Sequence, residues 1–445
     1  MSDQQPRFRE VSARVDFPAL DARVLSFWKE HRIFEKSLEG RDDAPVYVFY
    51  EGPPTANGRP GAHHVISRIF KDLFPRYKTM RGYRVPRKAG WDTHGLPVEL
   101  EVERRLGIDG KQQIEDYGVA EFNQLCRESV TAYLEEWNRF TERIGFWVDL
   151  GDAYYTFDNE YIETVWWLLR QIWDKGLLYQ GDKVVPYCPR CGTAISSHEV
   201  AQGYKDVTED SIYVRFPLKP EAAATLGAPA GAPVSLAVWT TTPWTLISNV
   251  AAAVRPDVAY ALVESRGERF VLARELVEKV LGKKAVVERE LAGGELLGLE
   301  YEPPFDFMTP DKRAQFVVGG DFVTTTDGTG IVHMAPAFGE DDMRVGLEND
   351  LPVVNAVDLE GRFVAEVTPW AGVFVKDADP AIIADLKARG LLLGVEPYEH
   401  SYPFCWRCDT ALLYYAKATW YIKTTAIKDE PVSYTHLTLP TNREV

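Results

Sequence analysis

The chain has 445 residues, of which 45% are hydrophobic and 26% charged, a balance typical of a folded protein with two or three cores. Its formal net charge of −16 argues against a protein that coats nucleic acid, because such proteins carry an extended basic surface. No stretch approaches the roughly 18 apolar residues of a membrane span, and residues 1–14 lack the apolar core of a signal peptide. We therefore expect a cytoplasmic protein without membrane contact, and a monomer.

The first third of the chain shows strand and helix patterns around two turn-rich loops. An apolar run at 46–50 predicts a strand, and apolar residues recur with helical spacing from Ile66 to Tyr77, which predicts an amphipathic helix ending near Gly82. Glycines and a proline predict a turn at 90–97. Three more helices are predicted, at 98–106, 119–144 and 161–176. Any contact with RNA would need a local basic patch, and seven basic residues are candidates for it: Lys71, Arg76, Lys78, Arg81, Arg84, Arg87 and Lys88.

After Gly181 the sequence changes to short runs of β-branched and aromatic residues separated by turn residues. This pattern predicts a β-rich module. The alanine-, glycine- and proline-rich stretch from Pro220 to Pro233 is interpreted as a surface excursion within it. Six strands are expected, at 211–216, 234–240, 260–264, 269–273, 315–318 and 330–333.

Four of the five cysteines form two pairs with the spacing of metal-binding knuckles, Cys188-Pro-Arg-Cys191 and Cys405-Trp-Arg-Cys408. Paired thiolates at i and i+3 can face one tetrahedral ion, so the pattern favours Zn²⁺, with unmetallated thiols and disulfides as the alternatives. The pairs lie 214 residues apart (405 − 191), so a site built from both would close the base of a large insertion. Cys126 lies in a helical stretch and is interpreted as a buried small side chain.

A glycine- and proline-rich loop follows the first strand and opens the amphipathic helix, a corner where helix N–H groups can hold phosphates. It ends in Gly61-Ala62-His63-His64. This resembles the His-x-Gly-His signature for ATP in class I aminoacyl-tRNA synthetases, with the first and third positions exchanged. The alternative is a histidine at a helix N-terminus that only contacts water.

Two motifs together carry a closer resemblance. Gly52-Pro-Pro-Thr-Ala-Asn-Gly58 and Gly90-Trp-Asp-Thr-His-Gly-Leu-Pro97 are similar to the motifs of the isoleucine-specific synthetases of class I, and the resemblance extends from about residue 16 to residue 430. It implies an α/β fold class, with an incomplete Rossmann-like catalytic domain interrupted by a β-rich editing domain. The implied substrates are isoleucine, ATP with Mg²⁺, and the isoleucine tRNA.

The resemblance also implies roles for residues of the catalytic half. His64 would donate to phosphate oxygens beside the helix dipole. We hypothesise that the exchange of the first and third signature positions is compensated. His63 would donate a hydrogen bond from a new backbone position, and Gly61 would remove the clash between that histidine and the adenine. The alternative is a degraded ATP site. Asp92 would hold the amino group of isoleucine, unless it only forms a turn or caps a helix. Pro53 and Asn57 would belong to the substrate pocket.

Two further motifs resemble a hydrolytic editing site, Trp239-Thr-Thr-Thr-Pro-Trp-Thr-Leu246 and the segment from Gly328 to Asp342. The family resemblance implies that Thr240, Thr241 and Thr242 surround the ester and its attacking water, that Asp342 holds the amino group, and that His333 judges side-chain size. The alternatives are a threonine run with β-propensity, a core histidine, and a solvated acidic turn.

These observations predict an amino-terminal catalytic segment (1–185), an inserted editing domain (186–400, with a zinc-knuckle base at 186–200), a return segment (401–430) and a foreign, poorly packed tail (431–445). The lysine-rich second ATP signature is absent. We therefore expect an isoleucine-tRNA ligase fragment that edits valyl-tRNA but cannot aminoacylate alone. A free-standing deacylase of mischarged tRNA and a zinc-stapled binding module are the alternatives.

Overall fold

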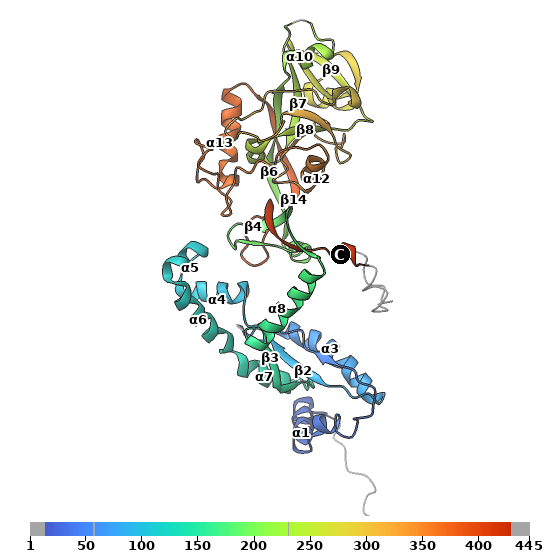
Figure 1. The fold of residues 1–445 in the computed structure, drawn as a ribbon, viewed down its shortest axis with the longest axis vertical. Coiled ribbons are helices and arrows are strands. Elements are labelled where there is room, and N and C mark those ends of the chain that lie inside the picture. Colours follow the sequence, from blue (N-terminus) through green and yellow to red (C-terminus); the bar gives the residue numbers. More distant parts are fainter. Residues whose placement is uncertain (1–13, 57, 230, 429–445) are drawn as a thin grey trace, which may run out of the picture. The chain divides into compact units, whose positions relative to one another are not determined.

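The computed structural model describes residues 14–56, 58–229 and 231–428, so the predictions for Asn57 and for the tail at 431–445 lie outside the described residues. The chain divides into two compact units, Met1–Asp174 and Lys175–Val445. Figure 1 follows the chain through both units. No helix in the described ranges is long and apolar enough to cross a membrane.

The N-terminal unit contains a parallel sheet of three strands in the order β1-β2-β3, with α3 as the connection from β1 to β2. The predicted α/β class is confirmed. Its elements are α1 (Phe17–Glu30), α2 (Ile33–Lys36), β1 (Phe49–Tyr50), α3 (Ala62–Met80), β2 (Arg87–Trp91), α4 (Leu96–Leu106), α5 (Lys111–Tyr117), α6 (Val119–Thr131), α7 (Leu134–Arg143), β3 (Asp149–Tyr155) and α8 (Asn159–Asp174).

Two predicted elements of this unit are shorter than expected. The helix expected at 119–144 is two helices, α6 and α7, because the chain leaves helical geometry at Tyr133, which packs with Leu134 on the aromatic cluster around Trp137. The strand expected at 46–50 is reduced to β1. The Tyr47 N–H donates to the Arg84 carbonyl, but Pro86 has no N–H to donate in return, so the ladder is interrupted.

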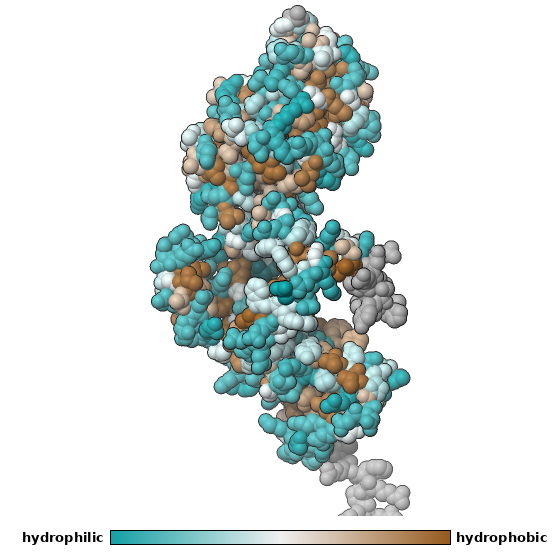
Figure 2. Space-filling model, in the orientation of Figure 1, coloured by the Kyte–Doolittle hydropathy of each residue, from teal (hydrophilic) through white to brown (hydrophobic). Residues whose placement is uncertain are grey.

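Helix α3 turns a polar face inward and its apolar stripe outward. Its buried residues are Arg68, Asp72, Pro75 and Thr79. The six apolar residues of the predicted stripe are between 48% and 63% exposed, and Figure 2 shows hydrophobic side chains at the surface over this helix. The stripe is Ile66, Ile69, Phe70, Leu73, Phe74 and Tyr77. Helical periodicity therefore identified the helix, while the face that packs on the unit is the polar one.

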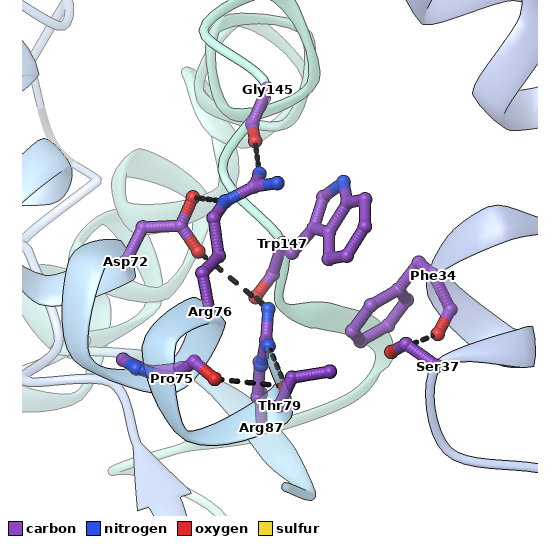
Figure 3. A network of polar contacts seen from close by, with 9 residues as sticks. All are labelled: Phe34, Ser37, Asp72, Pro75, Arg76, Thr79, Arg87, Gly145 and Trp147. Atoms are coloured by element: carbon purple, nitrogen blue, oxygen red, sulfur yellow. Dashed lines mark hydrogen bonds and ion pairs between the residues drawn. The ribbon is translucent and has the colours of Figure 1, made fainter. Parts of the chain in front are cut away.

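Two basic residues that had been candidates for an RNA-binding patch, Arg76 and Arg87, make polar contacts at the inward face of α3 (Figure 3). The Arg87 side chain is fully buried and donates to Thr79 Oγ1 at 2.7 Å. Arg76 donates to Asp72 Oδ2 at 2.5 Å and to the Gly145 carbonyl, and its guanidinium lies 4.0 Å from the centre of the Trp147 ring. The RNA-patch prediction is wrong for Arg87, whose buried charge stabilises the fold instead.

The C-terminal unit is β-rich, as predicted. A sheet of nine strands has the order β11-β9-β10-β7-β13-β8-β12, with β6 paired to both β7 and β14, and a second sheet has the order β15-β4-β5. Its strands are β4 (Leu178–Cys188), β5 (Thr193–Ala194), β6 (Tyr204–Pro217), β7 (Val234–Thr240), β8 (Ala251–Val254), β9 (Ala259–Ser265), β10 (Glu268–Ala273), β11 (Val286–Ala292), β12 (Phe316–Gly319), β13 (Ile331–Met334), β14 (Leu392–Pro403) and β15 (Leu413–Ile422).

Helices of the C-terminal unit are short except for two, α12 and α13, which lie on opposite sides of the large sheet in Figure 1. The α-helices are α9 (Ser197–Val200), α10 (Pro220–Thr225), α11 (Val277–Leu281), α12 (Glu340–Glu348) and α13 (Val375–Ala388), and the 3₁₀ turns are η1 (Pro243–Ser248), η2 (Arg274–Leu276), η3 (Gly293–Leu296) and η4 (Thr424–Ala426).

The stretch from Pro220 to Pro233 differs from the predicted surface excursion. It begins with α10, and Ala222, Ala223 and Leu226 are buried in the main core of the unit. Proline at the first helical position and the following alanines favour a helix turn, and their small side chains fit against the sheet.

The chain enters and leaves this unit along paired strands. Strand β14 pairs antiparallel with β6 from Tyr204 opposite Pro403 to Val214 opposite Leu392, and β15 pairs antiparallel with β4. This pairing brings residues more than 200 positions apart to the same end of the unit.

Candidate functional site

A cavity of about 190 Å³ opens in the C-terminal unit beside the end of β7. All five residues predicted for editing line it, together with five that were not singled out: Trp239, Thr245, Val332, Ala335 and Phe338. They come from different elements, because β7 ends at Thr240, β13 carries His333 and the first turn of α12 carries Asp342. The sequence-predicted set is thus brought together at one place: Thr240, Thr241, Thr242, His333 and Asp342.

Glycines of the second motif let these elements approach one another. Gly330 has a φ of +73°, and a Cβ there would lie 2.5 Å from the Cβ of Ala273. A Cβ on Gly339 would lie 2.8 Å from Asp342 Cγ. Side chains at these positions would displace β13 or the Asp342 carboxylate, so glycine is required by the geometry of the cavity.

Hydroxyl groups in the cavity form a connected chain. Thr242 Oγ1 lies 3.2 Å from Thr240 Oγ1 and 3.1 Å from Thr245 Oγ1, and Thr245 Oγ1 lies 2.8 Å from His333 Nε2. Thr245 donates its hydroxyl proton to the Thr242 carbonyl at 2.8 Å, so we assign the proton of the His333 ring to Nε2. His333 Nδ1 is then an acceptor, and it is buried with no hydrogen-bond partner among the described residues.

The two titratable groups of the cavity are both held away from their usual pKa values by burial. Desolvation lowers the pKa of His333 to about 4, so the ring is neutral at physiological pH. Desolvation raises the pKa of Asp342 to about 6, although the Ala335 N–H donates to its Oδ2 at 2.8 Å. Within the described ranges no basic side chain forms an ion pair with Asp342. The cavity therefore offers a partly buried carboxylate that has no cation partner among the described residues.

The second predicted site is the loop between β1 and α3. The Gly61 N–H donates to His64 Nδ1 at 2.8 Å, so His64 Nδ1 is an acceptor and the ring proton lies on Nε2. The His64 ring packs edge-on against Trp137 at 4.7 Å between centroids, and Trp137 Nε1 donates to the Gly58 carbonyl at 2.7 Å. Burial and the neighbouring His63 lower the pKa of His64. The histidine is therefore oriented as a neutral donor.

Gly61 and His63 are in steric contact, as the exchange hypothesis requires. The two histidine rings lie 3.8 Å apart between centroids. A Cβ built on Gly61 would lie 2.8 Å from His63 Cε1, so a side chain at position 61 would push the His63 ring out of its present position. Ala62 and His63 are exposed.

The loop carrying Pro53 and the loop carrying Asp92 are joined at the same edge of the parallel sheet. The Asp92 N–H donates to the Pro54 carbonyl at 3.1 Å, and Thr55 Oγ1 donates to Asp92 Oδ2 at 3.3 Å. Asp92 and Pro53 are partly buried. Glu51, at the start of the first loop, is buried, with Oε1 paired to Lys71 Nζ at 2.6 Å and Oε2 without a hydrogen-bond partner in the part of the chain that the structure describes.

The four paired cysteines form one cluster at the base of the C-terminal unit. Their Sγ atoms all lie within 4.8 Å of one another, and Cys408 Sγ is 3.5 Å from the Sγ atoms of Cys188 and Cys191. Zinc bound tetrahedrally at about 2.3 Å from each sulfur requires sulfur separations of about 3.8 Å, so the residues fit this ion. All five cysteines, each in a described range, are free, so the disulfide alternative is not realised.

Several residues of these sites carried no signal in the sequence. Trp137 comes from a helix about 70 positions after His64, and Thr245 was one threonine of a motif whose first three had been singled out. Asp379 of α13 accepts a hydrogen bond at 2.8 Å from the Trp244 N–H of η1, the turn that also carries Thr245. Only the fold brings such residues together, because their sequence neighbours give no indication of the contact.

Comparison with known proteins gives consistent matches. An isoleucine–tRNA ligase of Clostridium kluyveri is 52% identical over 96% of this chain and 40% of its own length, and one of Streptomyces coelicolor is 54% identical over 95% and 40%. Among solved structures, the agnB2 LeuRS of Agrobacterium radiobacter K84, in a ternary complex with tRNA and LeuAMS, aligns at 17% identity with a TM-score of 0.34, covering 89% of this chain and 52% of that chain.

The chain spans about 40% of the length of the curated relatives it matches. The family model described as tRNA synthetases class I (I, L, M and V) matches residues 23–439. The resemblance carried by the sequence motifs is thereby confirmed, and the chain belongs to the class I tRNA synthetases.

Proposed function

We propose that the chain is the amino-terminal part of an isoleucine–tRNA ligase that activates isoleucine with ATP and Mg²⁺, transfers it to the isoleucine tRNA, and hydrolyses valine from that tRNA. The observation that carries the hydrolytic part is the convergence of Thr240, Thr241, Thr242, His333 and Asp342 on one cavity. The names of the relatives support the ligase part.

The cavity suits an aminoacyl ester with a free amino group. The partly buried Asp342 carboxylate has no cation partner in the described part of the chain, and an ammonium group would supply one while returning the pKa of Asp342 toward its ordinary range. The threonine hydroxyls can donate to the ester oxygen and accept from a water molecule. Water adds to the ester carbonyl carbon, the bond to the tRNA ribose oxygen breaks, and that oxygen takes a proton, so free valine and tRNA are the products.

A second site is needed because binding alone discriminates weakly. One methylene group is worth about 1 to 3 kcal/mol in an apolar pocket, and the isoleucine and valine synthetases are the standard example of this limit. His333 would set the size limit of the cavity, because its neutral ring is fixed by Thr245 on one side.

The loop at the start of α3 suits the activation step. There the isoleucine carboxylate attacks the α-phosphorus of ATP and pyrophosphate leaves, so the protein mainly positions and stabilises charge. His64 would donate from Nε2 to a phosphate oxygen, since its Nδ1 already accepts from Gly61. His63 would donate beside it, Asp92 would hold the isoleucine ammonium, and Pro53 would line the side-chain pocket.

Zinc would be held by the four cysteine thiolates at the base of the insertion. The ion supplies no chemistry to either reaction there. It would hold together the two segments by which the chain enters and leaves the C-terminal unit.

A free-standing deacylase is the second candidate, because every lining residue of the cavity belongs to the C-terminal unit. The two candidates differ in activation: a chain whose full-length form exchanges pyrophosphate with ATP in the presence of isoleucine is a ligase.

Release of labelled valine from valyl-tRNA(Ile) by this chain tests the hydrolytic part. We expect release by the wild-type chain and a rate about 10- to 100-fold lower in Asp342→Ala, since a hydrogen bond to a charged group is worth about 1.5 to 3 kcal/mol. Asp341→Ala is the matched control, because Asp341 is exposed and paired with Arg344 at 3.1 Å. Wild-type release no faster than that of Asp342→Ala would refute the hydrolytic assignment.

A further inference from the structure

The 3₁₀ turn η1 follows three of the threonines that line the cavity. The side chain of its own N-cap residue does not accept a hydrogen bond from the N–H groups of its first turn. In most helical turns a serine or threonine at the N-cap accepts a hydrogen bond from the N–H of the second or third residue. The N-cap of η1 is Thr242, and its side chain makes no such bond. Its hydroxyl is instead within hydrogen-bond distance of Thr240 Oγ1 and Thr245 Oγ1, as described above.

The N–H groups of the first turn therefore need other acceptors. Pro243 has no N–H, and the Thr245 N–H donates to the Thr242 carbonyl at 3.1 Å. The remaining donor is the Trp244 N–H, and it donates at 2.8 Å to Asp379 Oδ1, which lies 135 positions later in α13. A carboxylate from another helix thus occupies the place that the Thr242 hydroxyl would take.

Asp379 is itself held in position. It is partly buried, and the basic group facing it is Lys376 of the same helix. Lys376 Nζ is 2.5 Å from Glu209 Oε1 of β6 and 3.9 Å from the centre of the Tyr402 ring of β14. The carboxylate therefore projects from a helix fixed to the paired strands β6 and β14.

We propose that Asp379 is a positioning residue for the hydrolytic site, and that by capping η1 from outside it leaves the Thr242 hydroxyl free to act in the cavity. This rests on the proposed hydrolysis of valyl-tRNA, and it adds a residue that does not line the cavity. Without the Asp379 carboxylate the Trp244 N–H loses its acceptor, and the Thr242 hydroxyl is the side-chain group one residue from the turn that can replace it. Once it caps η1, it no longer completes the chain from Thr240 to Thr245.

The proposal predicts non-additive kinetics for two substitutions. Valine release is measured for the wild-type chain, Asp379→Ala, Thr242→Val and the double variant. Each single variant should be about five- to tenfold slower, as expected for loss of one capping or hydroxyl contact. The double variant should be no slower than the slower single variant, because Asp379→Ala has already removed the Thr242 hydroxyl from the cavity. Multiplying effects in the double variant would overturn the proposal.

Two variants separate the hydrogen bond from general effects on α13. Asp379→Asn keeps an acceptor oxygen and should retain a rate within about twofold of wild type. Asp377→Ala is the matched control, because Asp377 is exposed on the same helix and should leave the rate unchanged. Asp379→Asn as slow as Asp379→Ala would contradict a role through the Trp244 N–H.

Amide hydrogen exchange tests the cap without relying on hydrolysis. The amide of Trp244 should exchange at least tenfold faster in the double variant Asp379→Ala/Thr242→Val, which has neither acceptor, than in Thr242→Val, which keeps Asp379, and it should stay protected in Asp379→Asn. Equal protection of this amide in Thr242→Val and in the double variant would overturn the proposal even if the chain is active. If the wild-type chain releases no valine, the proposed function fails, while exchange at Trp244 still decides whether Asp379 caps the turn.

Discussion

At the scale of single residues, the cavity beside β7, where we propose hydrolysis, is marked by polar groups that are removed from water and lack charged partners among the described residues. Among residues 14–56, 58–229 and 231–428, Asp342 has one backbone donor and no cation, and His333 has one hydrogen bond and an Nδ1 without a partner. Such groups are costly to bury unless something binds them, so they are a stronger indication of a ligand site than the cavity volume.

The raised pKa of Asp342 predicts the pH dependence of hydrolysis. The carboxylate must be ionised to hold the substrate ammonium, so kcat/KM for valine release should rise as the pH increases through about 6, the pKa of Asp342 in the free chain. Below that pH the protonated acid loses the ion pair. His333 adds no change in this range, because burial keeps its pKa at about 4.

Rates measured from about pH 5 to pH 8 check this prediction. Burial also raises the pKa of Asp379, to about 7, so the profile is best recorded in Asp379→Asn, where that group no longer titrates. A profile of Asp379→Asn without a rise near pH 6 would show that Asp342 does not bind the ammonium.

The exchanged signature at the start of α3 leads to a second prediction at this scale. His63 lowers the pKa of its neighbour His64, because two adjacent rings cannot both carry charge without repulsion. His63→Asn should therefore raise the pKa of His64, which NMR titration of its ring proton measures. An unchanged or lower value would mean that the two rings do not interact, and the hypothesis of a coupled exchange with Gly61 would lose its support.

At the scale of elements, α3 is anchored by polar rather than apolar contacts. Arg87, from the strand that follows it, lies beneath the helix, 3.6 Å from Asp72 Oδ1 and 2.7 Å from Thr79 Oγ1 (Figure 3). Burial lowers the pKa of Arg87 to about 10, yet the side chain remains charged at neutral pH. A buried charge of this kind stabilises the unit only while its partners are present.

Removal of the Arg87 guanidinium should destabilise the N-terminal unit strongly. We expect Arg87→Met to lower its free energy of unfolding by about 3 to 5 kcal/mol, since Asp72 would keep a buried charge with one partner fewer. Arg84→Met is the matched control, because Arg84 is 45% exposed and 3.9 Å from Asp42, a pair worth at most about 1 kcal/mol. Urea unfolding measures the free energy of unfolding of both variants. Equal stabilities of Arg87→Met and Arg84→Met would contradict the stabilising role of the Arg87 contacts.

At the scale of the whole molecule, the cysteine cluster joins segments near the two ends of the C-terminal unit. Cys188 ends β4 and Cys405 follows β14, so the four thiols meet only because β4 pairs with β15 and β6 with β14. A metal ion there would cross-link a loop of more than 200 residues and restrict the unfolded chain accordingly.

Removal of metal should therefore lower the stability of the C-terminal unit. We expect a zinc chelator, or Cys405→Ser, to lower its melting temperature by about 5 °C or more, and added zinc to restore the chelated chain. Cys126→Ser is the control, because Cys126 lies outside the cluster. Absence of zinc from the purified chain together with unchanged melting would exclude the structural metal.

The sequence by itself determined the family, six of the strands of the β-rich unit and the residue types of the cavity. Those features depend on local patterns: β-branched and aromatic runs in strands such as β7, glycines where backbones meet, and motifs such as the threonine run before Pro243. Each pattern lies within a few consecutive residues, so no knowledge of distant contacts was needed to recognise it.

Only the tertiary structure decided which face of α3 packs inward, which basic side chains are buried, and that Asp379 caps the turn η1. Each of these depends on a contact between residues far apart in the chain, such as Trp244 with Asp379. Burial and desolvation follow from such contacts, so the shifted pKa values of Asp342 and His333 could not be predicted from the motifs that contain them.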